Sequence, residues 1–228
     1  QEIEYALNFS SQRNSLAITS HVLLENNNDM LTIKATDQKM GFVSSIPVQT
    51  VVPGKTTVFC DKLLAILKTL PSSDIEFSEE DKKLTIKPID GTHINVNLKT
   101  TEYTKYPELI DVDESLYFSL TQKDFNDMVD KTSFAVSEDT TRFFLTGVYI
   151  EKKDGKLAMV ATDGRRLAFC HRAFEQEIPD FIPVIIPVKF LQLLKNISSG
   201  EGVFSLAVTP ANVFAKIGSR VIYSNLIS

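Results

Sequence analysis

The pattern of apolar and polar residues along the chain repeats after about 126 positions. Leu31-Thr-Ile-Lys-Ala-Thr-Asp37 and Leu157-Ala-Met-Val-Ala-Thr-Asp163 share their apolar spacing and their last three residues. An apolar segment precedes each of them, at Val22–Leu24 and at Val148–Ile150, and a polar turn lies between. Each copy therefore predicts a β-hairpin whose second strand ends in Ala-Thr-Asp.

A helical pattern follows in both copies, now at an offset of about 127. Val58–Leu70 and Ile185–Ile197 carry apolar residues three or four positions apart, which is typical of a helix that buries one broad face. Pro187 suits the first turn of the second helix, and Pro71 follows the end of the first. Lysines recur at matched positions off the apolar face: Lys62, Lys68, Lys189 and Lys195.

The second copy opens with a further strand and helix. Leu116–Leu120 alternates as a strand does, and Thr121–Phe134 has helical spacing with Thr121 as its N-cap. By the repeat, residues 2–9 are the end of the same helix in the first copy, which then lacks about 12 residues of its opening. Short alternating strands follow the later helices: Ile75–Phe77, Leu84–Lys87, Ile94–Leu98, Val203–Val208, Val213–Ile217 and Val221–Tyr223.

A polar segment with Pro107, Thr101–Asp113, links the two copies. We therefore expect one domain over residues 1–113, truncated at its N-terminus, and a second over residues 114–228. Two helices and several antiparallel strands per copy predict the α+β class. Since the first residue is Gln and not Met, we expect a fragment or a processed chain.

Composition and charge narrow the function classes. Of the 228 residues, 43% are apolar and 23% charged, which is typical of a packed protein and excludes a disordered one. No apolar stretch approaches the length of a membrane span, and no signal peptide is visible. The net charge of −5 argues against a protein that grips phosphates strongly. Locally the balance differs, because the four matched lysines share their helices with one acid, Asp61, whereas the helix at 121–134 is acidic.

The sequence contains no recognisable catalytic or metal-binding motif. Phosphate-binding glycine loops, the Gly-x-Ser-x-Gly motif and His or Cys clusters with metal-ligand spacing are all missing, so we expect no cofactor and no metal. Cys60 and Cys170 lie in apolar segments and are expected to be buried thiols. Asp37 and Asp163 could form the catalytic pair of an enzyme. Because they are repeat equivalents, we expect each to cap a turn instead.

The segment Ala161-Thr-Asp-Gly-Arg-Arg-Leu-Ala168 departs from its counterpart at 35–42. Gly164 permits a positive φ, and Arg165 and Arg166 follow it beside Leu167. Charge next to an apolar side chain is suited to binding a partner peptide. The alternative is a surface hairpin whose arginines pair with nearby acids.

With Arg142-Phe-Phe-Leu-Thr-Gly-Val-Tyr149, this segment resembles the second domain of the bacterial DNA polymerase III beta subunits, the sliding clamps. Arg13–Leu24 and Leu31–Asp37 resemble the first domain, and the similarity extends through nearly the whole chain. The resemblance implies the DNA-clamp fold, with three such domains per protomer and a homodimeric ring around duplex DNA. Without the third domain, this chain is not expected to close such a ring.

The resemblance also implies a function. The proteins that the chain resembles are processivity factors without an active site. By this resemblance, we expect the protein to act in DNA replication and repair in the bacterial cytoplasm, associated with the nucleoid. Its partners are duplex DNA, the replicative DNA polymerase and an ATP-driven clamp loader, and the protein partners bind through short linear peptides. No membrane partner is implied.

The same resemblance implies which residues form the binding sites. In this family the side chains that face DNA contact phosphates and do not read bases. Arg165 replaces the His often found at its position, and the second wall of the peptide groove would come from the third domain, so we expect this chain to bind peptides weakly. The groove floor is expected at Leu145, Thr162, Gly164, Arg165, Arg166 and Leu167. The DNA-facing positions are expected at Arg13, Lys62, Lys68, Arg142, Lys189 and Lys195.

Two other function classes stay open from the residues alone. An enzyme that uses Asp37 or Asp163 on a small substrate would have a deep pocket and carboxylates with shifted pKa values. A duplicated α+β adaptor would bind protein and not DNA.

Overall fold

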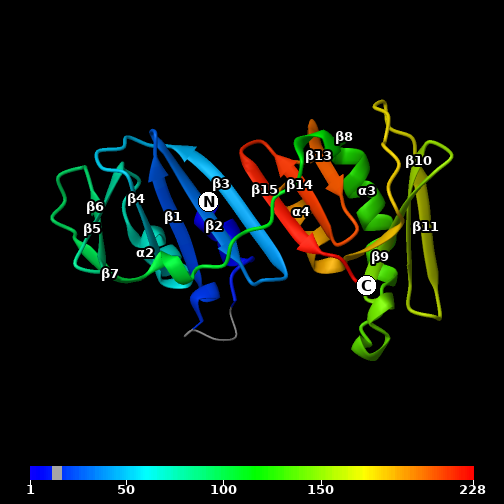
Figure 1. The fold of residues 1–228 in the computed structure, drawn as a ribbon, viewed down its shortest axis with the longest axis horizontal. Helices are drawn as coiled ribbons and strands as arrows, with labels where there is room; N and C mark the ends of the chain where they lie inside the picture. Colours follow the sequence, from blue (N-terminus) through cyan, green and yellow to red (C-terminus); the bar gives the residue numbers. More distant parts are fainter. Residues whose placement is uncertain (12–16) are drawn as a thin grey trace. The chain divides into compact units, whose positions relative to one another are not determined.

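A computed structural model describes residues 1–11 and 17–228 of the chain (Figure 1). The chain divides into two compact units, Gln1–Leu109 and Ile110–Ser228. The domain boundary expected near residue 113 lies in the segment just after this division. Arg13, one of the expected DNA-facing residues, lies outside the described residues.

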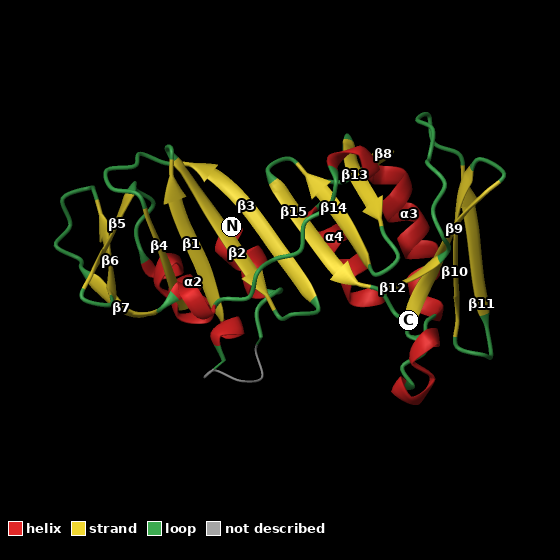
Figure 2. Ribbon diagram, viewed as in Figure 1, coloured by secondary structure: helices red, strands yellow, loops and turns green. Residues whose placement is uncertain are grey.

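Within the first unit, helices lie against an antiparallel sheet (Figure 2). Its strands follow the order β5-β6-β7-β4-β1-β2-β3. The elements are α1 (Glu2–Leu7), β1 (His21–Asn27), β2 (Met30–Thr36), β3 (Met40–Pro47), β4 (Gly54–Phe59), α2 (Cys60–Thr69), β5 (Ile75–Glu80), β6 (Lys83–Pro88) and β7 (Val96–Thr101), with 3-10 turns at Ile18–Ser20 and Tyr103–Lys105.

The second unit has the same kinds of element and a longer first helix. Its strands form antiparallel sheets with the orders β15-β14-β13-β8 and β11-β10-β9-β12. The helices are α3 (Gln122–Thr132) and α4 (Val188–Ile197), and 3-10 turns lie at Glu114–Leu116, Ser133–Ala135 and Thr140–Leu145. The strands are β8 (Phe118–Thr121), β9 (Gly147–Lys153), β10 (Lys156–Thr162), β11 (Leu167–Arg172), β12 (Val184–Pro187), β13 (Val203–Val208), β14 (Asn212–Ile217) and β15 (Arg220–Asn225).

The two predicted hairpins are confirmed, and they turn in the same way. β1 pairs with β2, and β9 pairs with β10, across two-residue loops. Asn28 and Asp29 have φ of 49° and 55°, and Asp154 and Gly155 have φ of 51° and 72°. Two successive positive φ angles match the right-handed twist of the flanking strands, so the turn residues fix the register of each hairpin.

The helices supply much of each unit's core, as their apolar spacing predicts. α2 buries Leu63 and Leu64, and α1 beside it buries Ile3 and Ala6. In the second unit, Phe125 of α3 meets Phe204 of β13 edge-on, with ring centroids 5.0 Å apart. α4 has the broadest buried face: Phe190, Leu191, Leu193, Leu194 and Ile197.

Several predicted boundaries were wrong, and at two of them a strand runs directly into a helix. Val58 and Phe59 end β4, and residues 185–187 belong to β12, so Pro187 is the N-cap of α4 and not part of its first turn. α3 ends at Thr132 because the chain tightens into a 3-10 turn. The strand expected from Leu116 begins at Phe118, after a 3-10 turn that the Asp113 side chain caps.

Some side-chain predictions also need correction. Thr121 is the N-cap of α3, but its hydroxyl donates to the Asp124 carboxylate at 2.6 Å and does not accept from the helix backbone. Cys60 is buried, which raises its pKa to about 12, whereas Cys170 is only half-buried.

Candidate functional site

A tight turn connects β10 to β11 and holds most of the expected groove residues. Thr162 Oγ1 donates to the carbonyl oxygen of Arg166 at 2.6 Å and accepts from the Gly164 amide at 3.1 Å. Asp163 Oδ1 accepts from the amides of Arg165 and Arg166, at 2.9 and 3.0 Å. The Thr-Asp pair therefore satisfies the polar backbone groups that the turn leaves open.

The equivalent turn of the first unit is built in the same way. Thr36 Oγ1 donates to the carbonyl oxygen of Met40 at 2.7 Å and accepts from the Gln38 amide at 2.9 Å. Asp37 Oδ1 accepts from the amides of Lys39 and Met40, at 2.9 and 2.7 Å. The prediction that Asp37 and Asp163 cap the same turn in each copy is confirmed.

These contacts make Asp163 a poor general acid or base. Its carboxylate accepts two backbone hydrogen bonds, and these, with the Arg166 guanidinium, lower its pKa from the ordinary value. A catalytic carboxyl group that works near neutral pH needs the opposite shift.

The turn needs a left-handed residue after Asp163. Gly164 has φ of +85°, and the equivalent Gln38 of the first unit has φ of +71°. A Cβ atom on Gly164 would lie 3.1 Å from the side chain of Arg142. Gly164 therefore serves both the backbone conformation and the close approach of Arg142.

Arg166 is held in place by several contacts. Its Nε lies 3.1 Å from Asp163 Oδ2, and its Nη2 donates to the carbonyl oxygen of Phe134 at 2.8 Å. Its guanidinium lies 5.5 Å from the centre of the Phe134 ring, a cation–π distance. The alternative in which the arginines pair with nearby acids is thus confirmed for Arg166, whose guanidinium also borders the exposed Phe134 ring.

A surface hollow of about 730 Å³ opens beside Arg166. Phe134, at 57% exposure, is one of its apolar residues, and Val188 and Gln192 of α4 also line it. The full lining is Ser133, Phe134, Val136, Ser137, Glu138, Thr140, Thr146, Asp163, Arg166, Val188 and Gln192.

Of the six expected groove residues, only Arg166 lines this hollow. Thr162, Gly164, Arg165 and Leu167 share its turn, and Leu167 is 66% exposed. Leu145 is half-buried at the end of the 3-10 turn before β9. The turn thus gathers these residues next to the hollow and not within it.

Phe134 lines the hollow, and the sequence did not single it out as a site residue. The spacing assigned it to the end of a helix, whereas α3 stops at Thr132 and Phe134 lies in the next 3-10 turn. Its partner Arg166 lies 32 residues away in the chain, and no local pattern indicates such a contact.

The expected DNA-facing cations fall into different environments. Lys62 and Lys189 are exposed, and neither forms an ion pair within the described part of the chain. Lys62 Nζ lies 5.8 Å from the centre of the Phe59 ring. Lys68 lies 2.8 Å from Glu4 Oε1, and Lys195 pairs with Asp130. Arg142 lies in the 3-10 turn Thr140–Leu145 near Gly164, and not on the helices that carry the four lysines, with its Nε 3.1 Å from Asp139 Oδ2.

The acids of α3 are neutralised by basic partners. Arg172 of β11 pairs with both Asp124 and Asp127, and Lys131 lies 2.7 Å from Asp127 Oδ2. Lys131 and Arg172 lower the pKa of Asp127, and the pKa of Asp124 is lowered chiefly by the hydrogen bond from the Thr121 hydroxyl and further by Arg172. The acidic character of this helix is therefore balanced at short range.

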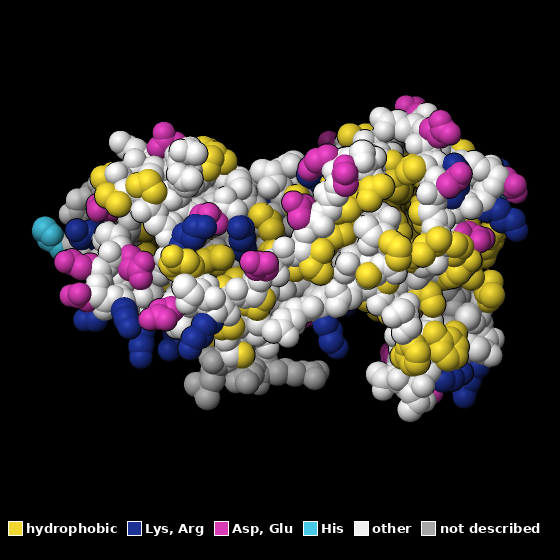
Figure 3. Space-filling model, in the orientation of Figure 1, with side chains coloured by type: hydrophobic (Ala, Val, Ile, Leu, Met, Phe, Trp, Pro, Cys, Tyr) yellow, Lys and Arg dark blue, Asp and Glu magenta, His cyan; other side chains and the backbone are white. Residues whose placement is uncertain are grey.

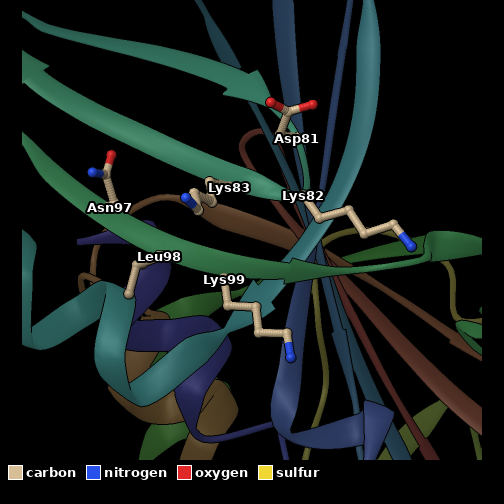
Figure 4. Close-up of a pocket in the computed structure, with 6 residues that line it drawn as sticks. All are labelled: Asp81, Lys82, Lys83, Asn97, Leu98 and Lys99. Atoms are coloured by element: carbon tan, nitrogen blue, oxygen red, sulfur yellow. The ribbon is translucent and has the colours of Figure 1, made fainter.

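Charges of both signs are interspersed over the face drawn in Figure 3. A second hollow, of about 410 Å³, lies in the first unit beside the β6–β7 pair (Figure 4). Lys83 and Lys99 are directly opposite each other in this pair, and Lys82 lies 3.9 Å from Glu102. None of the expected site residues lines this hollow, whose residues are Asp81, Lys82, Lys83, Asn97, Leu98 and Lys99.

Within residues 1–11 and 17–228, no group of three or more His, Cys, Asp or Glu side chains is arranged to hold a metal ion. Across the same residues, no helix has the length and apolar character that crossing a membrane requires.

Known proteins resemble the chain over its whole length. The Beta sliding clamp of Treponema pallidum is 35% identical over 227 residues, which cover 100% of this chain and 61% of that protein. The DNA polymerase III subunit beta of Pseudomonas aeruginosa aligns with a TM-score of 0.91 at 28% identity, covering 100% of this chain and 62% of that one. The Bacillus subtilis sliding clamp aligns with a TM-score of 0.92 over the same shares, and its 22% identity supports the fold alone.

These alignments confirm the expected clamp fold of the α+β class. The chain spans 58% to 61% of the length of the curated relatives compared. The family model described as the DNA polymerase III beta subunit, N-terminal domain, matches residues 1–110, and the one described as its central domain matches residues 119–228. The chain therefore belongs to the DNA polymerase III beta subunit family, and carries its N-terminal and central domains.

Proposed function

We propose that this chain is part of a sliding clamp, a non-catalytic processivity factor that encircles duplex DNA and tethers the replicative DNA polymerase. The observation that carries the proposal is the internal duplication, with beta-subunit domain models matching residues 1–110 and 119–228. In this proposal the protein works as a homodimeric ring in the bacterial cytoplasm, associated with the nucleoid and opened by a clamp loader.

The charge distribution supports weak, non-specific contact with DNA. Lys62 and Lys189 are exposed on equivalent helices, and each can reach a phosphate without reading a base. A closed ring is held on DNA by its topology. A net charge of −5 is therefore compatible with a DNA partner, because a strong grip on phosphates would slow sliding.

The β10–β11 turn supports the second part of the proposal, which is a site for short, mostly apolar peptides of the polymerase, the clamp loader and repair proteins. Leu167 offers exposed apolar surface, and Arg166 is held rigidly beside it. A rigid charged group next to an apolar surface reduces the entropy lost when a peptide binds. We assign the groove to Leu145, Thr162, Gly164, Arg165, Arg166 and Leu167.

The enzyme alternative has less support. Asp37 and Asp163 are both engaged by backbone amides of their turns, which leaves neither carboxylate poised for proton transfer. No described observation favours a small substrate at either residue.

The DNA part of the proposal is tested by charge reversal. In the protein as its cell makes it, loaded on nicked circular DNA, we expect Lys189→Glu with Lys195→Glu to shorten retention. The slope of log retention against log salt should fall by no more than about 2, which corresponds to at most one counterion per lysine. Lys156→Glu with Lys153→Glu, in the exposed β9–β10 turn, makes the same charge change away from these helices.

An unchanged salt slope in the Lys189 and Lys195 variant would contradict the assignment of these lysines to DNA. If the parent protein were not retained on the circular DNA at all while peptide binding persisted, the adaptor alternative would be the better account.

A further inference from the structure

Each unit contains the same ion pair between its two helices. In the first unit Lys68 of α2 lies 2.8 Å from Glu4 of α1. In the second unit Lys195 of α4 pairs with Asp130 of α3. Glu4 and Asp130 are equivalent at the hairpin offset of the repeat, and Lys68 and Lys195 are equivalent at the helix offset. The acid and the lysine therefore recur together, although the acid is Glu in one unit and Asp in the other.

Helix stability does not account for these pairs. The side chains are 59% and 54% exposed in the first pair, and 39% and 58% exposed in the second. Ion pairs this exposed contribute little to stability, because water screens them and ordering two long side chains costs entropy. Their position matters more, since both lysines belong to the positions that are expected from the sequence to face DNA.

We propose that Glu4 and Asp130 are positioning residues that hold Lys68 and Lys195 back from DNA phosphates. To neutralise a phosphate, each lysine has to give up a carboxylate that already binds it, and the net gain is then small. The carboxylate also repels the approaching phosphate. The inference rests on the proposed function, and it provides the weak contact that a sliding ring needs.

The same helices also carry lysines without an ion pair, with which the paired lysines can be compared. Lys62 and Lys189 precede the paired lysines on α2 and α4 and form no ion pair within the described residues. Each helix thus combines one open lysine with one that an acid restrains. The restraining acids come from the neighbouring helices α1 and α3. The charge that each lysine helix offers to a phosphate therefore depends on both helices of its pair.

The test measures binding of a short fluorescent duplex to the chain, by anisotropy over a salt titration. We expect Asp130→Asn and Glu4→Gln each to tighten binding by about two- to fivefold, the range set by the strength of exposed ion pairs. Asp61→Asn is the matched control. It removes the same charge from the exposed face of α2, and Asp61 forms no ion pair within the described part of the chain. It should tighten binding less.

A double-mutant cycle separates positioning from a general charge effect. If Asp130 acts through Lys195, then Asp130→Asn in a Lys195→Gln background should tighten binding no more than Asp61→Asn does. The same holds for Glu4→Gln in a Lys68→Gln background. Thermal unfolding should change little in all these variants, which a purely structural pair would not predict.

The failures are distinguishable. If Lys195→Gln and Lys68→Gln leave binding unchanged even in the Asp130→Asn and Glu4→Gln backgrounds, where no acid restrains the lysine, the DNA role of these lysines is wrong, and the inference falls with it. If the lysine variants weaken binding, but Asp130→Asn matches Asp61→Asn or acts equally without Lys195, the inference is overturned and the proposed function stands.

Discussion

Asp163 and Asp37 show how one side chain can specify a turn. Each places its Oδ1 within hydrogen-bond distance of two successive amides, and the preceding Thr closes the other side of the loop. The same chemistry supports two different sequences, Gly-Arg-Arg in one unit and Gln-Lys-Met in the other. The scaffold of the turn is therefore separate from the side chains that it displays, and the second unit can present arginines without changing its backbone.

The charge on Asp163 makes this turn sensitive to acid. Because the folded state lowers the pKa of Asp163, its contribution is fully present above the ordinary carboxyl pKa and is lost as pH falls through the lowered value. Asp163→Asn keeps an acceptor oxygen without the charge. We expect it to lower the thermal midpoint at neutral pH, with the difference from the parent chain shrinking below about pH 4. A difference that grew on acidification would contradict this.

At the scale of elements, buried helix faces hold each unit together. α4 follows β12 without a break, so its first turn is fixed by a strand, and its apolar face meets the sheets. Phe190 is fully buried, whereas the preceding residue, Lys189, is exposed. Neighbouring positions on one helix thus serve the core and the surface.

This contrast predicts very different effects for adjacent substitutions. Phe190→Ala should destabilise the protein by about 3–5 kcal/mol, because it removes a buried ring and leaves a cavity. Lys189→Ala should change stability by no more than about 0.5 kcal/mol, because an exposed side chain has little packing to lose. Urea unfolding of both variants measures the difference. Similar losses would show that Lys189 has a structural role.

At the scale of the whole molecule, short-range pairing matters more than net charge. The chain has 24 Lys and Arg against 29 Asp and Glu, and many of them meet across elements. The acids of α3 are paired with Arg172, Lys131 and Lys195. The net charge of the whole chain is therefore a poor guide to the local charge that a pair of helices offers to DNA.

The groove residues lead to a prediction about peptide affinity. Only Arg166 of the six assigned residues lines the hollow beside the turn, so a short apolar peptide would bury little surface on this chain. We expect calorimetry to give a Kd weaker than about 1 μM, because so small a contact barely offsets the entropy lost on binding. Arg166→Ala should weaken binding further. Submicromolar binding to the parent chain would contradict the prediction.

The sequence by itself determined the duplication, the hairpins and the turn caps, because each depends on local chemistry. Asn28-Asp29 and Asp154-Gly155 adopt positive φ angles, and Asp37 and Asp163 reach amides only two or three residues away. The helix cores were likewise predictable from spacing, although their ends were not, since β4 and β12 run into α2 and α4 without a break.

Only the tertiary structure decided which side chains meet. Lys68 and Glu4 are 64 residues apart in the chain, Lys195 and Asp130 are 65 apart, and Arg166 reaches Phe134 across 32. Periodicity states which face of a helix is polar, but the partner of a polar side chain depends on how that helix packs. These long-range contacts decide that Lys68 and Lys195 are paired with an acid, whereas Lys62 and Lys189 are not paired within the described residues.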